Sequence, residues 1–258
     1  NYTVTATGSC ANVSSPGTII VTAAPTTANA GSPQPAVSGN TATLAANAPV
    51  NGTGNWSIVG TPNDGSFADA NDPQTTFTGV VGKTYTLRWT ITNGTCAPST
   101  SDVQITLNAV ANSTTVSVTT TTYGNTSVDL TASVSPNPGG GTIQFYVDDN
   151  AVGSPVAVAS NGSATLNYNP SALAAGPHTV TASFSGYGVY ESSTSNGSTL
   201  TVEKRSLKIQ ADAKEKFYGE ADPEFTYNIV AGSLVNGDEL SGELDRVGGD
   251  GAGDYAIL

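Results

Sequence analysis

The run Tyr85-Thr-Leu-Arg-Trp-Thr-Ile91 alternates large apolar side chains with polar ones along its whole length. The aromatic and aliphatic members share one face, and the Thr and Arg side chains share the other. A period of two is that of a half-buried β-strand, because successive side chains of a strand point to opposite faces. Asn93-Gly94 then supplies a turn, and Asp102-Val-Gln-Ile-Thr-Leu107 returns with the same alternation. The two runs predict an antiparallel hairpin.

The composition of the whole 258-residue chain favours the same class of fold. Only 37% of the residues are hydrophobic and only 11% are charged, whereas Thr, Ser, Gly, Asn, Ala and Val dominate. The β-branched side chains of Thr and Val fit a pleated surface, and Gly and Asn supply turns. Helix surfaces need Glu, Lys, Arg and Gln, which are scarce before residue 203. We therefore expect an all-β protein of about two or three domains.

Charge and residue counts exclude several classes of function. The formal net charge is −12 with only eight Lys and Arg, so the surface should repel nucleic acid and anionic membranes. No run reaches the roughly 18 apolar residues of a membrane-spanning helix, so direct membrane insertion is not expected. Two cysteines and one histidine exclude a Cys/His zinc site within one module and a Cys-His nucleophilic pair at suitable spacing.

An internal repeat is visible at the start of the chain. Tyr2 and Cys10 stand in the same order as Tyr85 and Cys96. Residues 1–25 are therefore predicted to be the closing hairpin of a preceding copy. Equivalent positions of consecutive modules lie about one module length apart, beyond the roughly 7 Å Cα limit for a bridge. No disulfide is therefore expected between the two cysteines.

The first complete module is predicted at residues 26–112 and contains four separated blocks. They are GTGNWSIVG (52–60), GSFADANDPQTTFTG (65–79), GKTYTLRWTITNGTC (82–96) and STSDVQITLN (99–108). Together these blocks resemble the PKD-like repeats of large Bacteroidota surface adhesins. The resemblance implies a β-sandwich that covers nearly the whole module.

A second module of a different kind is predicted at residues 113–203. Six or seven alternating runs in about 90 residues have the spacing of a β-sandwich. Its blocks are TYGNTSVDLTASVSP (122–136), GGGTIQFYVDD (139–149), GSATLNY (162–168), LAAGPHTVTASFSGYGVY (173–190) and STSNGSTLTV (193–202). They resemble the bacterial Ig-like repeats of cell-surface proteins.

Residues 204–258 differ in composition, because eleven of the twenty acidic and six of the eight basic residues fall there. The blocks FYGEADPEFTYNIVAGSLVNGDELSGELDR (217–246) and GDGAGDYAIL (249–258) resemble the YGX-type MBG repeat, another extracellular β module. The resemblance stops short of the final strands of such a repeat. A partial MBG-like module is therefore expected.

These resemblances imply tandem immunoglobulin-like β-sandwich modules in an elongated array, with the last module incomplete. They imply a non-catalytic stalk or adhesin segment of a large secreted protein on the bacterial cell surface, which extends a distal binding region from the cell. Export by the type IX machinery and a role in gliding motility or a surface filament are implied in the same way. Surface glycans or neighbouring copies of the adhesin are the expected partners. The chain lacks Met and a signal peptide, so it is expected to be an internal piece.

Two other functions remain open at this stage. The modules themselves could bind carbohydrate, with or without calcium, which an exposed aromatic platform would indicate. Alternatively, they could be accessory modules of a multidomain secreted hydrolase whose catalytic domain lies elsewhere. A fold does not determine a function, so the choice among these functions depends on the candidate site residues.

No cofactor is expected, and the only metal considered is Ca²⁺. Asp64, Asp69 and Asp72 crowd one loop together with Asn63 and Asn71, and Ca²⁺ prefers such oxygen ligands. The loop lacks the D-x-D-x-D-G spacing of a dedicated calcium loop, and Asp-Pro and Asn-Asp also form ordinary turns. These three aspartates are weak calcium candidates, and plain turns are the favoured interpretation.

No catalytic site is predicted. His178 begins a strand without a Ser-Asp partner pattern, and the resemblance places it in the sandwich scaffold. The carboxylates of the last module could suggest a pair for sugar hydrolysis. However, a small partial module offers little room for a substrate cleft. The acids considered are Glu220, Asp222, Glu224, Asp238, Glu239, Asp250 and Asp254.

Trp56, Trp89 and the tyrosines could stack on sugars if they were exposed. Trp89 alternates with core positions, and Trp56 shares a face with Ile58. Both are therefore predicted to be buried core residues.

Overall fold

The computed structural model describes residues 2–5, 14–17, 23–249 and 251–258. Every regular element in these ranges is a β-strand, so the predicted all-β fold is confirmed. The chain divides into two compact units, residues 1–111 and 112–258. Among the described residues, none belongs to a helix of the length and apolarity that a membrane crossing requires.

The first unit begins with an antiparallel pair of short strands, β1 (Tyr2–Thr5) and β2 (Ser14–Gly17). Tyr2 is the register partner of Gly17, and Thr5 that of Ser14. Cys10, on which the disulfide prediction depends, lies outside the described residues.

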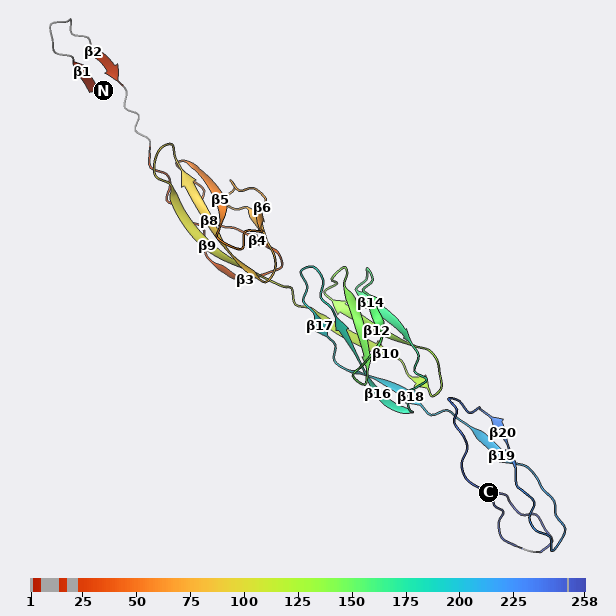
Figure 1. Cartoon of the computed structure of the whole chain (residues 1–258). Coiled ribbons are helices and arrows are strands. Elements are labelled where there is room, and N and C mark those ends of the chain that lie inside the picture. Colours follow the sequence, from red (N-terminus) through yellow and green to blue (C-terminus); the bar gives the residue numbers. More distant parts are fainter. Residues whose placement is uncertain (1, 6–13, 18–22, 250) are drawn as a thin grey trace. The chain divides into compact units, whose positions relative to one another are not determined.

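Two sheets make up the rest of this unit (Figure 1). The larger sheet has the order β3-β9-β8-β5, and the smaller sheet has the order β4-β7-β6. Their strands are β3 (Gln34–Ser38), β4 (Thr41–Thr43), β5 (Thr53–Val59), β6 (Ser66–Phe67), β7 (Thr76–Thr78), β8 (Lys83–Thr92) and β9 (Ser99–Asn108). The predicted hairpin is confirmed, because β8 and β9 pair in antiparallel register from Lys83–Leu107 to Ile91–Ser99.

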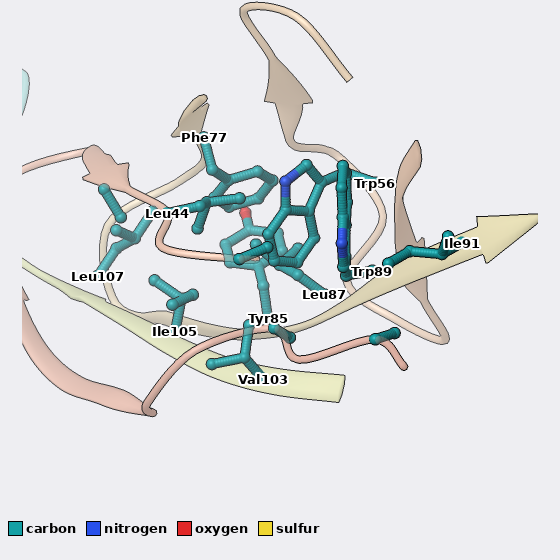
Figure 2. Packing of buried hydrophobic residues seen from close by; sticks show 14 residues of the cluster. Leu44, Trp56, Phe77, Tyr85, Leu87, Trp89, Ile91, Val103, Ile105 and Leu107 are labelled. Carbon is teal, nitrogen blue, oxygen red and sulfur yellow. The ribbon is translucent and has the colours of Figure 1, made fainter. Parts of the chain in front are cut away.

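Side chains from one face of each sheet form the core of this sandwich (Figure 2). The alternating apolar positions of β8 are completely buried, and they meet Phe77 of β7 and Leu44 from the facing layer. Both tryptophans are buried, as predicted. Burial of apolar surface contributes roughly 25 cal/mol per Å², so the burial of these large side chains stabilises the module.

The second unit contains a further sandwich. A three-stranded sheet β10-β12-β15 faces a sheet with the order β11-β18-β16-β13-β14, and β17 also pairs with β16. The strands are β10 (Ser113–Val118), β11 (Thr121–Thr122), β12 (Val128–Ser135), β13 (Thr142–Val147), β14 (Asn150–Ala157), β15 (Ser163–Tyr168), β16 (Gly176–Phe184), β17 (Ser193–Thr194) and β18 (Ser198–Glu203). Strands β12, β13 and β16 contribute most of the buried side chains.

Among its described strands, each sandwich has one parallel pair. In the first sandwich β3 runs parallel to β9, where Val37 is opposite Leu107. In the second β11 runs parallel to β18, where Thr121 is opposite Val202. All other pairs in the two sandwiches are antiparallel.

The remainder of the second unit contains one antiparallel pair, β19 (Lys208–Ala211) and β20 (Tyr227–Ala231). No described residue after 203 is buried. This segment therefore has no core among its described residues, unlike the two sandwiches.

Candidate functional site

Asp64 has two partners on the hairpin that closes the first sandwich. The Tyr85 hydroxyl donates to Asp64 Oδ1 at 2.7 Å, and Lys83 Nζ donates to Asp64 Oδ2. The Tyr85 oxygen in turn accepts the backbone N–H of Val80 at 2.9 Å. Tyr85 is fully buried, so its ring belongs to the core while its hydroxyl reaches the edge of the sandwich. The Asp64 carboxylate is thus used to hold the loop against β8.

The electrostatics of this cluster are those of a structural ion pair. The hydrogen bonds from Lys83 and then from Tyr85 hold the pKa of Asp64 below its ordinary value. The same carboxylate raises the pKa of Lys83, and burial raises the pKa of Tyr85. All three groups therefore keep one protonation state at neutral pH, whereas a general acid or base needs a pKa near the working pH.

The other two calcium candidates serve as turn residues. Asp69 Oδ1 accepts the backbone N–H of Asn71 at 2.9 Å, and Asp72 Oδ1 accepts that of Gln74 at 2.9 Å. A carboxylate that accepts the N–H two residues further along forms an Asx turn. The hydroxyl of Thr75 accepts the N–H of Asp69 at 2.9 Å and links the two turns.

The structure does not combine Asp64, Asp69 and Asp72 into one ligand set. Within residues 2–5, 14–17, 23–249 and 251–258, no three His, Cys, Asp or Glu side chains are placed to hold a metal ion together. Each candidate carboxylate has a hydrogen-bond donor within the chain. The geometry thus gives the calcium hypothesis no support.

His178 is paired with Asp148 of the β13–β14 turn. Its Nδ1 lies 2.6 Å from Asp148 Oδ2, and its Nε2 lies 2.9 Å from the carbonyl oxygen of Ala174. The second oxygen of Asp148 accepts the backbone N–H of Thr179 at 2.9 Å. Both ring nitrogens face acceptors, and only a protonated imidazole can donate to two acceptors. Asp148, and then Ala174, accordingly raise the pKa of His178, while His178 lowers that of Asp148.

This pair lacks the further parts of a catalytic site. A nucleophile needs a neutral base within hydrogen-bond reach, and both nitrogens of His178 are already engaged. The hydrogen bonds join the β13–β14 turn, the loop before β16 and β16 itself. The His178–Asp148 pair is therefore a clip within the sandwich.

Two of the acids considered in the last segment also have structural partners within it. Asp222 accepts hydrogen bonds at 2.9 Å from Arg246 Nε and forms an ion pair at 2.7 Å with Lys216. These two cations lower the pKa of Asp222, with Lys216 as the larger cause. Glu220 Oε2 accepts the N–H of Phe217 at 3.3 Å. Asp250 lies outside the described residues.

The tryptophans are not the aromatic residues that the structure exposes most. Trp56 is only 2% exposed, whereas Phe217 and Tyr218 are 80% and 84% exposed. The two rings border a hollow of about 910 Å³ that Asp222 and Arg246 also line. The adjacent aromatic pair before Gly219 is the sequence signal that could have found them.

The matches to family models lie in the second unit. Residues 114–203 match the bacterial Ig-like domain (group 3). Residues 207–258 match the MBG domain (YGX type). The expected Ig-like and MBG resemblances are thus confirmed, whereas no such match supports the PKD-like assignment. No curated protein matches the chain.

Several solved structures are similar to this chain at low identity. The fibronectin(III)-like modules of Clostridium thermocellum CbhA are 14% identical, with 69% of this chain and 94% of that chain covered and a TM-score of 0.29. A 1.5-MDa bacterial ice-binding adhesin is 15% identical, with coverages of 75% and 70% and a TM-score of 0.35. A tetra-tandem repeat from the extending region of a large adhesion protein is 21% identical, with coverages of 68% and 47% and a TM-score of 0.36.

Proposed function

We propose that this chain is a non-catalytic, load-bearing stalk segment of a large secreted bacterial surface adhesin. The match to a bacterial Ig-like domain followed by an MBG domain supports a repeat protein of the cell exterior. The partners of Asp64, Asp222 and His178 support a structural use of the charged residues. Type IX export, a place in a motility or filament adhesin, and contacts with glycans or neighbouring copies belong to the same proposal.

The observation that carries this proposal is the parallel pair of strands in each sandwich. β3 precedes all other strands of its sandwich and pairs in parallel with the last strand, β9. When the two ends of the module are pulled apart, two parallel strands must slide past each other, so their hydrogen bonds are loaded together. An antiparallel pair that is opened from one end breaks its bonds one at a time. In the second sandwich the last strand, β18, also has a parallel partner, β11, although β10 precedes β11 along the chain.

Single-molecule stretching of the whole chain tests the load-bearing role. In one attachment, handles at Ser113 and Glu203 load the parallel β11–β18 pair in shear, and they load the β10–β12 pair as well. In the control, handles at Gly176 and Glu203 open the antiparallel β16–β18 pair from its end, where Gly176 is opposite Val202. We expect a clearly higher rupture force for the first attachment. Equal forces in the two geometries would contradict a load-bearing design.

Carbohydrate binding is the second candidate, and the exposed Phe217–Tyr218 pair is the observation that favours it. Aromatic faces next to carboxylate and guanidinium groups are the surroundings in which sugars are bound. A glycan panel screened with calcium and again with a chelator, using the whole chain and its Phe217→Ala/Tyr218→Ala variant, distinguishes the two functions. The stalk function predicts no binding above background. Binding that the double variant loses would make this segment a receptor site.

A further inference from the structure

The Ig-like domain carries a small surface next to the point at which the chain leaves β18. The backbone N–H of Tyr123 donates to the carbonyl oxygen of Glu203 at 2.8 Å, so Tyr123 is fixed to the last residue of β18. Gly124 follows with a φ of +80°, a conformation that L side chains rarely adopt. The carbonyl group of Ser171 belongs to the loop between β15 and β16. It lies on the same surface, because a single turn of the following segment contacts both Ser171 and Tyr123.

That turn is formed by Val235, Asn236, Gly237 and Asp238. Asn236 and Gly237 have φ values of +56° and +77°, and the N–H of Asp238 donates to the carbonyl oxygen of Val235 at 2.9 Å. Two successive left-handed residues make a tight turn of fixed shape, and Asn and Gly are the residues that tolerate this conformation best. The turn is therefore closed by a hydrogen bond within the segment itself.

Three side chains of the turn contact the Ig-like domain. The Tyr123 hydroxyl donates to Asp238 Oδ1 at 3.1 Å, and Asn236 Nδ2 donates to the carbonyl oxygen of Ser171 at 2.8 Å. Val235 packs directly on Gly124, where an added Cβ would lie only 2.4 Å from Val235 Cγ2. Two hydrogen bonds at different points and one steric fit together specify a single orientation of the turn.

The contact also encloses apolar surface. A hollow of about 460 Å³ is bordered by Ala174 and Ala175 of the Ig-like domain and by Leu207 and Leu234 of the following segment. No described residue after 203 is buried, so this segment has no core of its own to fix its position. The contacts with Tyr123, Gly124 and Ser171 therefore help to determine the position of this segment on the Ig-like domain.

We propose that Tyr123, Gly124 and Ser171 form a docking surface for the Val235–Asp238 turn of the MBG-like segment. This contact is a second attachment between the two parts, besides the peptide linker between β18 and β19. One flexible linker permits rotation in all directions, whereas a linker and a distant contact permit very little. The docked turn thus fixes the direction in which the chain leaves the Ig-like domain. The proposal holds whether or not the chain acts as a stalk.

Residual dipolar couplings of the whole chain test this docking. Two rigidly joined parts share one alignment tensor, whereas independently moving parts have tensors of different magnitude. In the wild type we expect one tensor to fit both residues 113–203 and residues 208–249. In the Val235→Ala/Asp238→Ala variant, the tensor of the second part should shrink several-fold. Unchanged amide shifts in β12, β13 and β16 verify that the sandwich is still folded.

A second variant and a control separate docking from general effects. Asn236→Gly keeps the left-handed turn and removes only the amide that reaches Ser171, so it should weaken the shared alignment in part. Tyr218→Phe changes an exposed phenol of the same segment and should have no effect. Different tensors in the wild type, or one shared tensor in the Val235→Ala/Asp238→Ala variant, would overturn the proposal.

Discussion

Trp56 and Trp89 are direct register partners on β5 and β8, and their rings pack 5.2 Å apart in the centre of the first sandwich. Their indole nitrogens differ. Trp89 Nε1 donates to the carbonyl oxygen of Asn47 at 3.1 Å, whereas the buried Trp56 Nε1 has no hydrogen-bond partner among the described residues. A buried donor without a partner destabilises the folded state, so the two rings differ in what their polar atom contributes.

Replacement of each tryptophan by phenylalanine should therefore have unequal effects. Both variants lose ring volume, but Trp89→Phe also leaves the Asn47 carbonyl without its donor. Trp56→Phe instead removes an unpaired N–H. We expect Trp89→Phe to lower the free energy of unfolding by about 1–3 kcal/mol more than Trp56→Phe. Urea denaturation of the two variants measures the difference, and equal losses would contradict the assignment.

Gly54 is needed because the Trp89 ring lies against its backbone. A Cβ at this position would lie only 2.0 Å from Trp89 Cζ2. Overpacking of this kind costs about 1–3 kcal/mol, so Gly54→Ala should destabilise the module by such an amount. In a Trp89→Phe background the ring no longer has its Cζ2 atom, and Gly54→Ala should cost much less. A double-mutant cycle measures this coupling, and strictly additive effects would show that the clash is absent.

The ring of Tyr85 lies in the core, and its hydroxyl bonds to Asp64 and to the Val80 N–H. Removal of the hydroxyl alone should therefore lower the free energy of unfolding. Tyr85→Phe leaves the Val80 N–H without an acceptor and Asp64 without one of its donors, which should cost about 1–2 kcal/mol at neutral pH. The folded-state pKa of Asp64 is lowered, so its contribution is present above the ordinary value of 3.8 and is lost as the pH falls through the folded-state value. The cost of Asp64→Asn should therefore shrink in acid.

Urea titrations of the wild type, Tyr85→Phe and Asp64→Asn at neutral pH and in acid measure both effects. Asp69→Asn is the matched control, since an asparagine oxygen can still accept the Asn71 N–H and no ion pair is lost. A loss for Asp69→Asn as large as that for Asp64→Asn would contradict the special role of Asp64.

The alternation of side chains was sufficient to predict the strands and the core, but not the contacts between distant residues. A period of two shows which face of 85–91 is buried, and both tryptophans were correctly placed inside. It does not show which strands are neighbours, so the parallel β3–β9 and β11–β18 pairs could not be foreseen. The partners of Asp64 lie 19 and 21 residues away, and only the packing of the loop on β8 brings them together.

The His178–Asp148 clip shows the same limit. The resemblance placed His178 in the sandwich scaffold, and the structure agrees, since His178 lies in β16. Its partner Asp148 lies in the turn between β13 and β14. However, the two residues are 30 positions apart, with β14 and β15 between them, so the pairing depends on the register of β13 with β16, where Val147 is opposite Val180. A pattern in the local sequence carries no information about that register.

Because of the His178–Asp148 pair, the free energy of unfolding of the second unit should fall as the pH rises. The pKa of His178 is raised above its ordinary value of 6.5, so its contribution is complete below that value and is lost as the pH rises through the folded-state value. Its side chain is only 13% exposed, and Asp148, whose charge also acts on Tyr168, is the charged group that faces it. Between about pH 5.5 and 8.5 we expect a loss of about 1 kcal/mol.

Asp148→Asn is the decisive variant, because asparagine tolerates the left-handed backbone of this position, where φ is +47°. It removes the charge that stabilises the imidazolium, so the pKa of His178 should fall and the alkaline loss of stability should largely disappear. Asp149→Asn, the adjacent left-handed position, changes the same charge and should leave both quantities nearly unchanged. His178 is the only histidine of the chain, so its ring signals can be titrated by NMR without assignment. A His178 pKa that is identical in the wild type and in Asp148→Asn would show that the clip is not formed in solution.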